Sequence, residues 1–264
     1  MNDTGIIWTE ATWNPMSGCE KISAGCAFCY AHTLAENKRG TMAFPKGFDL
    51  TLRPHKLKEP FALKRPTLIF CNSMSDLFWR EIPDEYRDKV VDVIEQTPQH
   101  QYQVLTKRAD VLLQYSRRRR LPSNFWAGVS IENQDNAVRA DLLREVRAEI
   151  RFISAEPLLG PLRIDWSGIQ WVITGGESGN HLLNPKLREV RALVTYDGKT
   201  WSPRADRMDW VRWIRDDLKR SGGMFFHKQW GGRTPHSAGR ELDGRTWDEF
   251  PLMHISKSNR GGYL

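Results

Sequence analysis

A short apolar run that ends abruptly in polar residues recurs six times after residue 65. Each run is rich in valine, isoleucine, phenylalanine and leucine, which is typical of short strands buried on both faces. The runs are residues 67–70, 102–105, 125–129, 151–153, 171–174 and 224–226. A seventh strand is expected near the N-terminus, at residues 12–14. The repeat indicates a sheet whose strands are separated by longer connections.

Amphipathic helical patterns lie in three of these connections, at residues 85–96, 135–150 and 207–220. Their apolar faces are Val90, Val91 and Ile94 in the first, Val138, Leu142, Val146 and Ile150 in the second, and Val211, Ile214 and Leu218 in the third. Asp135 is placed to cap the second helix, and the third is expected to stop at Gly222 and Gly223.

Alternation of strands and helices implies parallel βαβ units with right-handed crossovers. We therefore expect an α/β fold, a full or partial (β/α) TIM-like barrel, with an open doubly wound sheet as the alternative. Irregular segments at residues 36–65, 184–203 and from 232 onward would be insertions, of which the first and last are basic. No long linker divides the 264 residues. One domain over residues 1–264 is expected, with residues 233–264 as a C-terminal tail or lid.

The polar residues that end each run would meet at one edge, because both architectures place the active site at the carboxyl ends of the strands. The alternative is that these residues simply begin loops. Several endings hold serine, glutamate, lysine or histidine, so a shared polar pocket is expected. Glu156, His227 and Lys228 are its candidates for substrate contact or proton transfer.

Three of the four cysteines crowd into eleven residues, with the spacing C-x6-C-x2-C at Cys19, Cys26 and Cys29. Three thiolates can hold three irons of a [4Fe–4S] cluster and leave the fourth iron open. With His32 the same cysteines would form a Cys3His set for zinc. A disulfide with one spare thiol is a further alternative. Cys71 is most simply a buried cysteine at the end of a strand.

The net charge of +7, from 39 basic and 32 acidic residues, favours polyanionic partners only slightly. A run of four arginines at residues 117–120 is either a phosphate contact or a solvated loop. No apolar run approaches the roughly 18 residues that a membrane span needs. Residues 1–13 lack the pattern of a signal peptide. A cytoplasmic protein is expected, in the host cytoplasm if it is phage-encoded.

The chain resembles the radical S-adenosylmethionine (SAM) superfamily through a three-cysteine loop after the first strand, an aromatic residue before the third cysteine, and the βα array that follows. The superfamily's usual spacing is C-x3-C-x2-C, so the gap of six residues is a departure. More closely, the chain resembles the phage three-Cys-motif family of radical-SAM-like proteins. The matching stretches are the cysteine loop and residues 72–78, 105–107, 154–160, 175–179 and 227–231.

The resemblance implies a radical-SAM type barrel in which Cys19, Cys26 and Cys29 hold a [4Fe–4S] cluster. SAM would bind the open iron, and its reductive cleavage would yield a 5′-deoxyadenosyl radical. An external electron donor such as flavodoxin or ferredoxin would supply the electron. The positions that would bind SAM are Asn72, Ser73, Ser75, Asp76, Thr106, Lys107, Ser130, Glu132, Gly175, Gly176 and Glu177.

The resemblance and the basic insertions together suggest DNA or a nucleotide as substrate. The reaction would be a phage DNA hypermodification, such as isomerisation of an amino-acid adduct on thymine, although isomerase, lyase and transferase classes stay open. One alternative is a photoproduct-repair lyase, and another is a zinc-stabilised nucleic-acid-binding module without activity. A third is a SAM-independent barrel enzyme with Glu156, Glu177, His227 and Lys228 as acid–base groups.

Overall fold

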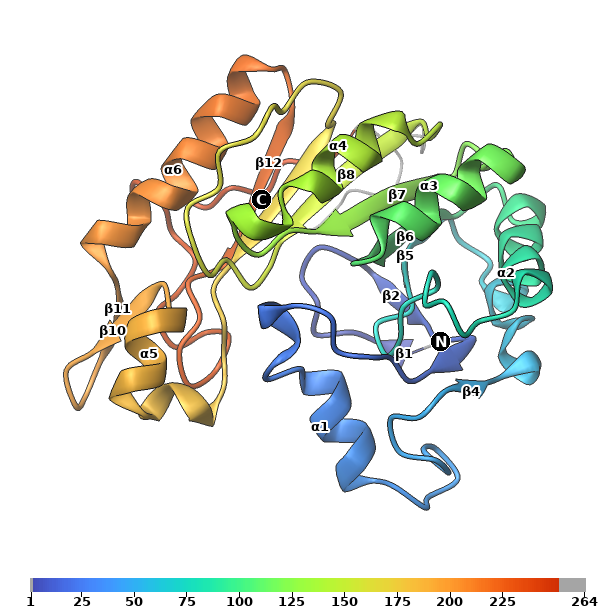
Figure 1. Cartoon of the computed structure of the whole chain (residues 1–264), viewed down its shortest axis with the longest axis horizontal. Coiled ribbons are helices and arrows are strands. Elements are labelled where there is room, and N and C mark those ends of the chain that lie inside the picture. The colour runs from blue at the N-terminus through green and yellow to red at the C-terminus, as the bar shows by residue number, and fades with distance from the viewer. Residues whose placement is uncertain (1, 252–264) are drawn as a thin grey trace.

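Seven parallel strands form the centre of the molecule in a computed structural model that describes residues 2–251 (Figure 1). A short antiparallel strand, β1 (Asn2–Asp3), pairs with the first of them. The parallel strands are β2 (Ala11–Trp13), β5 (Leu68–Cys71), β6 (Gln101–Thr106), β7 (Phe125–Ser130), β8 (Ile150–Ala155), β9 (Trp171–Gly175) and β12 (Met224–Gln229). All seven strands expected from the sequence are therefore confirmed.

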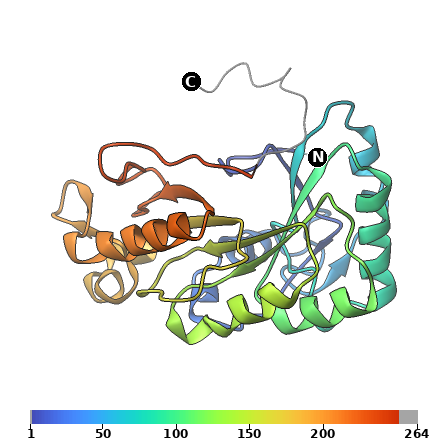
Figure 2. The same cartoon turned by 90° about the horizontal axis from the view of Figure 1, so that it is seen from above.

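The strand order decides between the two architectures. Neighbouring strands follow the chain in the order β1-β2-β5-β6-β7-β8-β9-β12, without the reversal that defines a doubly wound sheet. Within residues 2–251 no pairing joins β12 to β1 or β2, so the barrel does not close. The sheet is strongly curved, with helices along its outer side (Figure 2). The fold is a partial (β/α) barrel.

The helices and the smaller elements lie in the connections. The α-helices are α1 (Tyr30–Asn37), α2 (Asp84–Gln96), α3 (Ala109–Arg118), α4 (Val138–Glu145), α5 (Pro185–Arg191) and α6 (Ala205–Arg220). Single 3-10 turns are η1 (Ala24–Cys26), η2 (Pro54–Lys56), η3 (Glu59–Ala62), η4 (Gln134–Asn136) and η5 (Asn180–Leu183). Two small antiparallel pairs complete the elements. One joins β3 (Met16–Ser17) to β4 (Thr51–Leu52), and the other is the hairpin of β10 (Val194–Tyr196) and β11 (Trp201–Pro203). No helix within the described range is long and apolar enough to cross a bilayer.

Two of the predicted helices are confirmed with their buried faces. In α2 the side chains of Val90, Val91 and Ile94 are fully buried. In α6 the buried apolar residues include Val211 and Ile214, and the helix ends before Gly222, whose φ of 79° favours glycine. Both helices therefore pack against the sheet on the face that their sequences predict.

The helix predicted at residues 135–150 is wrong in its bounds. Asp135 lies within the 3-10 turn η4 and accepts a hydrogen bond from the Asn133 side chain at 3.0 Å, so it does not cap α4. The helix ends after Glu145, because Val146 is extended and the chain must turn into β8 at Ile150. Val138, expected to face inward, is 58% exposed.

The segment at residues 184–203, expected to be irregular, is also more ordered than predicted. It contains α5 and the β10–β11 hairpin. The Asn184 side chain caps α5 by accepting from the amide of Lys186 at 2.9 Å, and Pro185 occupies the first helical position. These start signals were in the sequence, but the helix is too short to show an apolar period.

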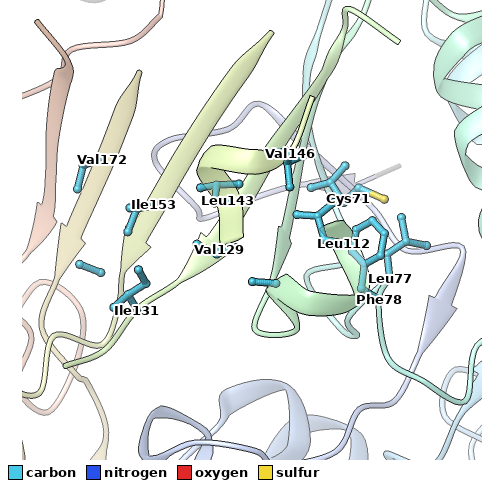
Figure 3. Packing of buried hydrophobic residues seen from close by; sticks show 14 of the residues in the cluster. Cys71, Leu77, Phe78, Leu112, Val129, Ile131, Leu143, Val146, Ile153 and Val172 are labelled. Carbon is cyan, nitrogen blue, oxygen red and sulfur yellow. The ribbon is translucent and has the colours of Figure 1, made fainter. Parts of the chain in front are cut away.

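Side chains alternate across the sheet and form two cores. On the outer side, Cys71, Val129, Ile153 and Val172 face the helices, where Leu112 and Leu143 meet them (Figure 3). Cys71 is thus the buried strand-end cysteine that was predicted. On the inner side of the curved sheet, the core consists mainly of large aromatic residues. They are Trp8, Phe70, Trp126, Phe152, Trp171 and Phe226.

The tail from residue 232 runs back along the edge of the sheet as far as it is described. Trp247 accepts a hydrogen bond from the amide of His227 at 2.9 Å, and the ring of Phe250 lies 5.1 Å from that of Trp171. Arg233 and Pro235 reach the cavity described below. The rest of the predicted tail or lid, residues 252–264, lies outside the described residues.

Candidate active site

A cavity of about 580 Å³ opens at the carboxyl ends of the parallel strands. Trp8, Phe70 and Leu105 line its inner part, and Lys21 and Arg233 also lie on its wall. Its polar lining comes from the residues that end successive strands, as the sequence predicted. They are Asn72, Ser73, Ser75, Asp76, Thr106, Lys107, Ser130, Ser154, Glu156, Gly176, Glu177, Lys228 and Gln229.

The cysteine loop, residues 18–30, covers one side of this cavity, and Cys19, Cys26 and Cys29 all line it. The loop begins at Gly18, which pairs with Ser75 and has a φ of 99°. A Cβ at Gly18 would lie 2.5 Å from the backbone oxygen of Asp49. Only glycine therefore fits this entrance to the loop.

The middle of the cysteine loop is anchored from two directions. Ser23 Oγ donates to Glu132 Oε1 at 2.6 Å, and a Cβ at Gly25 would lie 2.6 Å from the same carboxylate. On the other side, Arg191 Nη2 donates to the carbonyl oxygen of Ala24 at 3.0 Å. Glu132 follows β7 and Arg191 ends α5, so elements far apart in the sequence hold the loop against the cavity.

The geometry of the thiols bears on which metal group the loop fits. All four cysteines are free, which gives no support to a disulfide. Among residues 2–251 no three histidine, cysteine or acidic side chains are close enough to hold one ion. His32 packs edge-on against Phe48 at 5.4 Å. The Cys3His zinc set is therefore not assembled. Three thiols on one cavity wall are the donor set of a [4Fe–4S] cluster, in which each thiolate binds a separate iron.

Asp76 lies in the connection between β5 and α2 and is the centre of one buried hydrogen-bond network. It accepts from Thr106 Oγ1 at 2.6 Å, from the Lys107 amide at 3.1 Å and from Arg108 Nη1 at 3.0 Å. Arg108 in turn donates to Cys19 Sγ at 3.6 Å. Burial raises the pKa of Cys19 to about 12, and Asp76 adds to the rise, while Arg108 opposes it.

Glu132 is the centre of a second network and is fully buried. It contacts Lys107 and Ser23, and accepts from Arg139 Nη1 at 2.9 Å. Burial raises the pKa of Glu132, but Lys107, Ser23 and Arg139 together lower it below its usual value. Burial also raises the pKa of Cys26, but the charge of Lys107 and hydrogen bonds from Ile22 and Ser23 together outweigh burial and lower the pKa overall.

Two of the three predicted catalytic residues meet in the cavity. Glu156 Oε1 lies 3.1 Å from Lys228 Nζ, and Ser154 donates to Glu156 Oε2 at 3.2 Å. A Cβ at Gly175 would lie 2.5 Å from Glu156 Oε1. Gly175 itself does not line the cavity but leaves room for the carboxylate that does.

His227, the third predicted catalytic residue, does not reach the cavity. It is fully buried, with Nδ1 2.9 Å from Thr174 Oγ1 and its ring against Trp230. Burial lowers the pKa of His227 to about 3, and the nearby charge of Arg240 adds to this. The strand turns this side chain into the packed interior, while the next residue, Lys228, faces the cavity.

The Gly-Gly-Glu segment is held tightly by its neighbours. A Cβ at Gly176 would lie 1.9 Å from the backbone oxygen of Trp230. Both oxygens of Glu177 accept from Arg191 at 2.6 Å, and His181 adds a contact at 3.0 Å. The Glu177 carboxylate is thus already paired within the protein.

The other predicted cofactor-binding residues differ in whether their polar groups already have partners within the protein. Asn72 is buried with a φ of 67°, and neither of its amide atoms has a partner in the described structure. The side chains of Ser73 and Asn14 are 3.0 Å apart. Ser75, Thr106 and Ser130 also lie on the wall. Glu132 does not line the cavity directly and reaches it through Lys107.

Three of the four arginines in the run at residues 117–120 are paired with acidic residues. Arg117 pairs with Glu145 at 2.5 Å, and Arg118 pairs with Asp88 at 2.8 Å. Arg119 pairs with Asp92 at 2.8 Å and with other acidic residues of α2. The run joins α3 to α2 and α4, outside the cavity.

Sequence reasoning missed several residues that shape the site, namely Ser23, Arg108, Arg191 and Gln229. Arg108 directly follows the predicted Thr106 and Lys107, so its place after a strand was a usable signal. Arg191 lies in a segment that showed no periodic pattern, and its contact with Ala24 joins positions 167 residues apart. Only the folded chain could reveal that contact.

The fold and the cavity together define an α/β partial-barrel protein with a cysteine-lined site at the carboxyl ends of its strands. By its sequence, the chain belongs to the family described as "Protein of unknown function (DUF5131)", whose model matches residues 3–195 and 197–251. That match does not test the resemblance to the phage three-Cys-motif family.

No curated protein matches the chain significantly. Solved structures that it resembles include spore photoproduct lyase complexed with dinucleoside spore photoproduct, at 12% identity and a TM-score of 0.48. A cysteine-to-alanine mutant with the same ligand gives 11% and 0.48. Both cover 83% of this chain and 75% of the other. This similarity is too remote to indicate the chemistry of the present chain.

Proposed function

We propose that this protein is an enzyme of the radical SAM type, in which Cys19, Cys26 and Cys29 hold a [4Fe–4S] cluster. The observation that supports the proposal is that all three thiols line one cavity together with polar residues from the ends of six strands. Such an edge is where catalytic groups gather in βα barrels. Cys71, the fourth cysteine, faces the helices instead and lies outside the cavity.

When bound, the cluster and SAM would supply a 5′-deoxyadenosyl radical that removes a hydrogen atom from the substrate. The protein's own groups bind and orient. Lys228, paired with Glu156, is a cation on the cavity wall that can hold a carboxylate or phosphate. The hydroxyls of Ser73, Ser75 and Ser130 offer hydrogen bonds elsewhere on the cavity wall. An external electron donor such as flavodoxin or ferredoxin belongs to this proposal.

The proposed substrate is a nucleic-acid base or nucleotide. Trp8, Phe70 and Leu105 give the inner cavity an apolar wall suited to a planar base, while Lys21 and Arg233 add positive charge. Rearrangement of an amino-acid adduct on thymine in phage DNA is the finer form of the proposal. It depends on the sequence resemblance alone, and it leaves the choice among isomerase, lyase and transferase to experiment.

A Cys26→Ala variant tests the proposal, with Cys71→Ala as the matched control. After anaerobic reconstitution with iron and sulfide, the wild type and Cys71→Ala should show the broad visible absorbance of a cluster. Both should form 5′-deoxyadenosine from SAM under reduction. Cys26→Ala should lose at least 90% of the cluster iron and of the product, because a three-thiolate site has no spare ligand.

The measurement is iron and sulfide content, the visible spectrum and chromatography of 5′-deoxyadenosine. If the wild type bound stoichiometric zinc and no labile iron, the radical SAM proposal would be wrong. Activity that survived in Cys26→Ala would point to a SAM-independent enzyme with structural cysteines. A His32→Ala variant should keep its cluster, since His32 faces Phe48.

A further inference from the structure

Two basic residues that follow β6 lie directly against the cysteine loop. Arg108 Nη1 is 3.6 Å from Cys19 Sγ, and Nη2 donates to the carbonyl oxygen of Glu20 at 3.3 Å. Lys107, one residue earlier, lines the same cavity as Cys26. Two consecutive residues thus bring positive charge to the cysteine-lined cavity, and the second of them contacts Cys19 directly.

Both cations are held in place by a buried carboxylate. Asp76 Oδ2 accepts from Arg108 Nη1 at 3.0 Å, and Glu132 contacts Lys107. Asp76 is 5% exposed and also accepts from Thr106 and from the amide of Phe78. These carboxylates are therefore occupied, and they are poorly placed to bind a second ligand such as the SAM amino group.

Arg108 differs from an ordinary surface arginine in its environment. It is only 6% exposed, so its charge is weakly screened by solvent. Its guanidinium donates to a thiol and a carboxylate from Nη1 and to a backbone oxygen from Nη2, with the nitrogens held in one rigid plane. No other arginine or lysine in residues 2–251 has a hydrogen bond to a cysteine sulfur.

We propose that Arg108 is a positioning residue, held in place by Asp76. It fixes the Cys19 thiolate and raises the reduction potential of the cluster that Cys19 would ligate. The inference rests on the proposed function. A hydrogen-bond donor and a positive charge beside a ligating sulfur stabilise the reduced cluster, which carries more negative charge. Arg108 thereby helps the cluster accept an electron, and it is not itself a ligand for SAM.

An Arg108→Gln variant tests this inference, with Arg118→Gln as the matched control. Both remove one arginine charge, but Arg118 lies on α3 and pairs with Asp88 and Asp84 away from the cavity. Arg108→Gln should disfavour reduction of the cluster about tenfold, which corresponds to a fall of about 59 mV for one electron. Arg118→Gln should leave the potential unchanged.

Potentials are measured by redox titration followed by electron paramagnetic resonance, with circular dichroism to confirm folding. Arg108→Lys keeps the charge but not the fork, so a smaller fall is expected. It carries the test if Arg108→Gln does not fold. An unchanged potential in the folded variant would contradict the inference. So would weaker SAM binding in equilibrium dialysis at an unchanged potential, since it would make Arg108 a SAM ligand. A wild type without any cluster would instead contradict the proposed function.

Discussion

Cys26 and Cys71 are both buried thiols, yet their surroundings are opposite. Burial raises the pKa of Cys71, and nothing opposes it. For Cys26, the charge of Lys107 and hydrogen bonds from the loop outweigh burial and lower the pKa. The difference arises because β5 directs Cys71 toward the helices, whereas the loop places Cys26 on the cavity. At the scale of single residues, a side chain's chemistry depends on which face of the sheet it occupies.

His227 shows the same dependence and makes the protein's stability sensitive to pH. Its pKa is about 3 in the folded protein, lowered by burial from an ordinary 6.5. Below pH 6.5 the imidazole of His227 is protonated in the unfolded chain but stays neutral in the folded protein. The contribution of neutral His227 to the unfolding free energy is therefore fully present above pH 6.5, and it falls by about 1.4 kcal/mol per pH unit toward pH 3.

A His227→Gln variant should therefore show a smaller loss of unfolding free energy between pH 7.5 and pH 5, by about 2 kcal/mol. Urea unfolding at the two pH values measures this loss. The comparison uses the change with pH in each protein, so a uniform loss of stability in the variant does not affect it. Equal losses in the wild type and the variant would show that His227 is protonated in the folded state.

At the scale of elements, the register of β7 and β8 determines how the inner core is filled. Gly128 pairs directly with Phe152, and a Cβ at Gly128 would lie 2.2 Å from the phenylalanine ring. Phe152 is fully buried beside Trp171, at 5.6 Å between ring centres. The absence of a side chain at one position on β7 thus makes room for an aromatic side chain on β8.

A Gly128→Ala variant should lower the free energy of unfolding by about 1–3 kcal/mol, because the added methyl group overpacks this core. Gly5→Ala is the matched control, since nothing lies within 4 Å of a Cβ there. It should change stability by less than about 0.5 kcal/mol. Thermal and urea unfolding measure both. A Gly128→Ala protein as stable as the control would mean that Phe152 can move aside at little cost.

At the scale of the whole molecule, the open side of the half-barrel is bridged by side chains. Arg191, the last residue of α5, donates to Ala24 in the cysteine loop and forms two hydrogen bonds of 2.6 Å with Glu177. Its guanidinium also lies 5.1 Å from the ring centre of Phe28, which stacks on His181 at 3.8 Å. These contacts join the N-terminal loop to the insertion after β9 without a backbone ladder.

An Arg191→Met variant should therefore loosen the cysteine loop and destabilise the protein. Removing one partner leaves Glu177 buried and short of donors, which costs about 3–5 kcal/mol for a buried pair. Hydrogen exchange should increase at residues 19–29, and the unfolding free energy should fall. Arg204→Met, which removes an arginine whose partner Glu189 is mostly exposed, should change neither by much. Unchanged exchange in Arg191→Met would show that the loop is held without this bridge.

Much of the fold follows from local patterns. Runs such as residues 125–129 are recognisable because a buried parallel strand needs apolar residues on both faces. The helix predicted to reach Ile150 was too long, since Val146 and Ile150 continue a helical spacing by chance and the turn into β8 overrides it. A repeat of spacing indicates a helix but does not indicate where the chain must turn.

For the site, the sequence by itself determined which residue types would stand at the strand ends, and the cavity contains Glu156 and Lys228 as expected. Only the tertiary structure decided their partners. It turned His227 inward, occupied Asp76 and Glu132 with cations, and brought Arg108 to Cys19. The physical reason is the sequence separation of the interacting residues. Strand and helix patterns arise from residues that are close in sequence. Charge pairing depends on contacts between distant segments, which form only when the barrel folds.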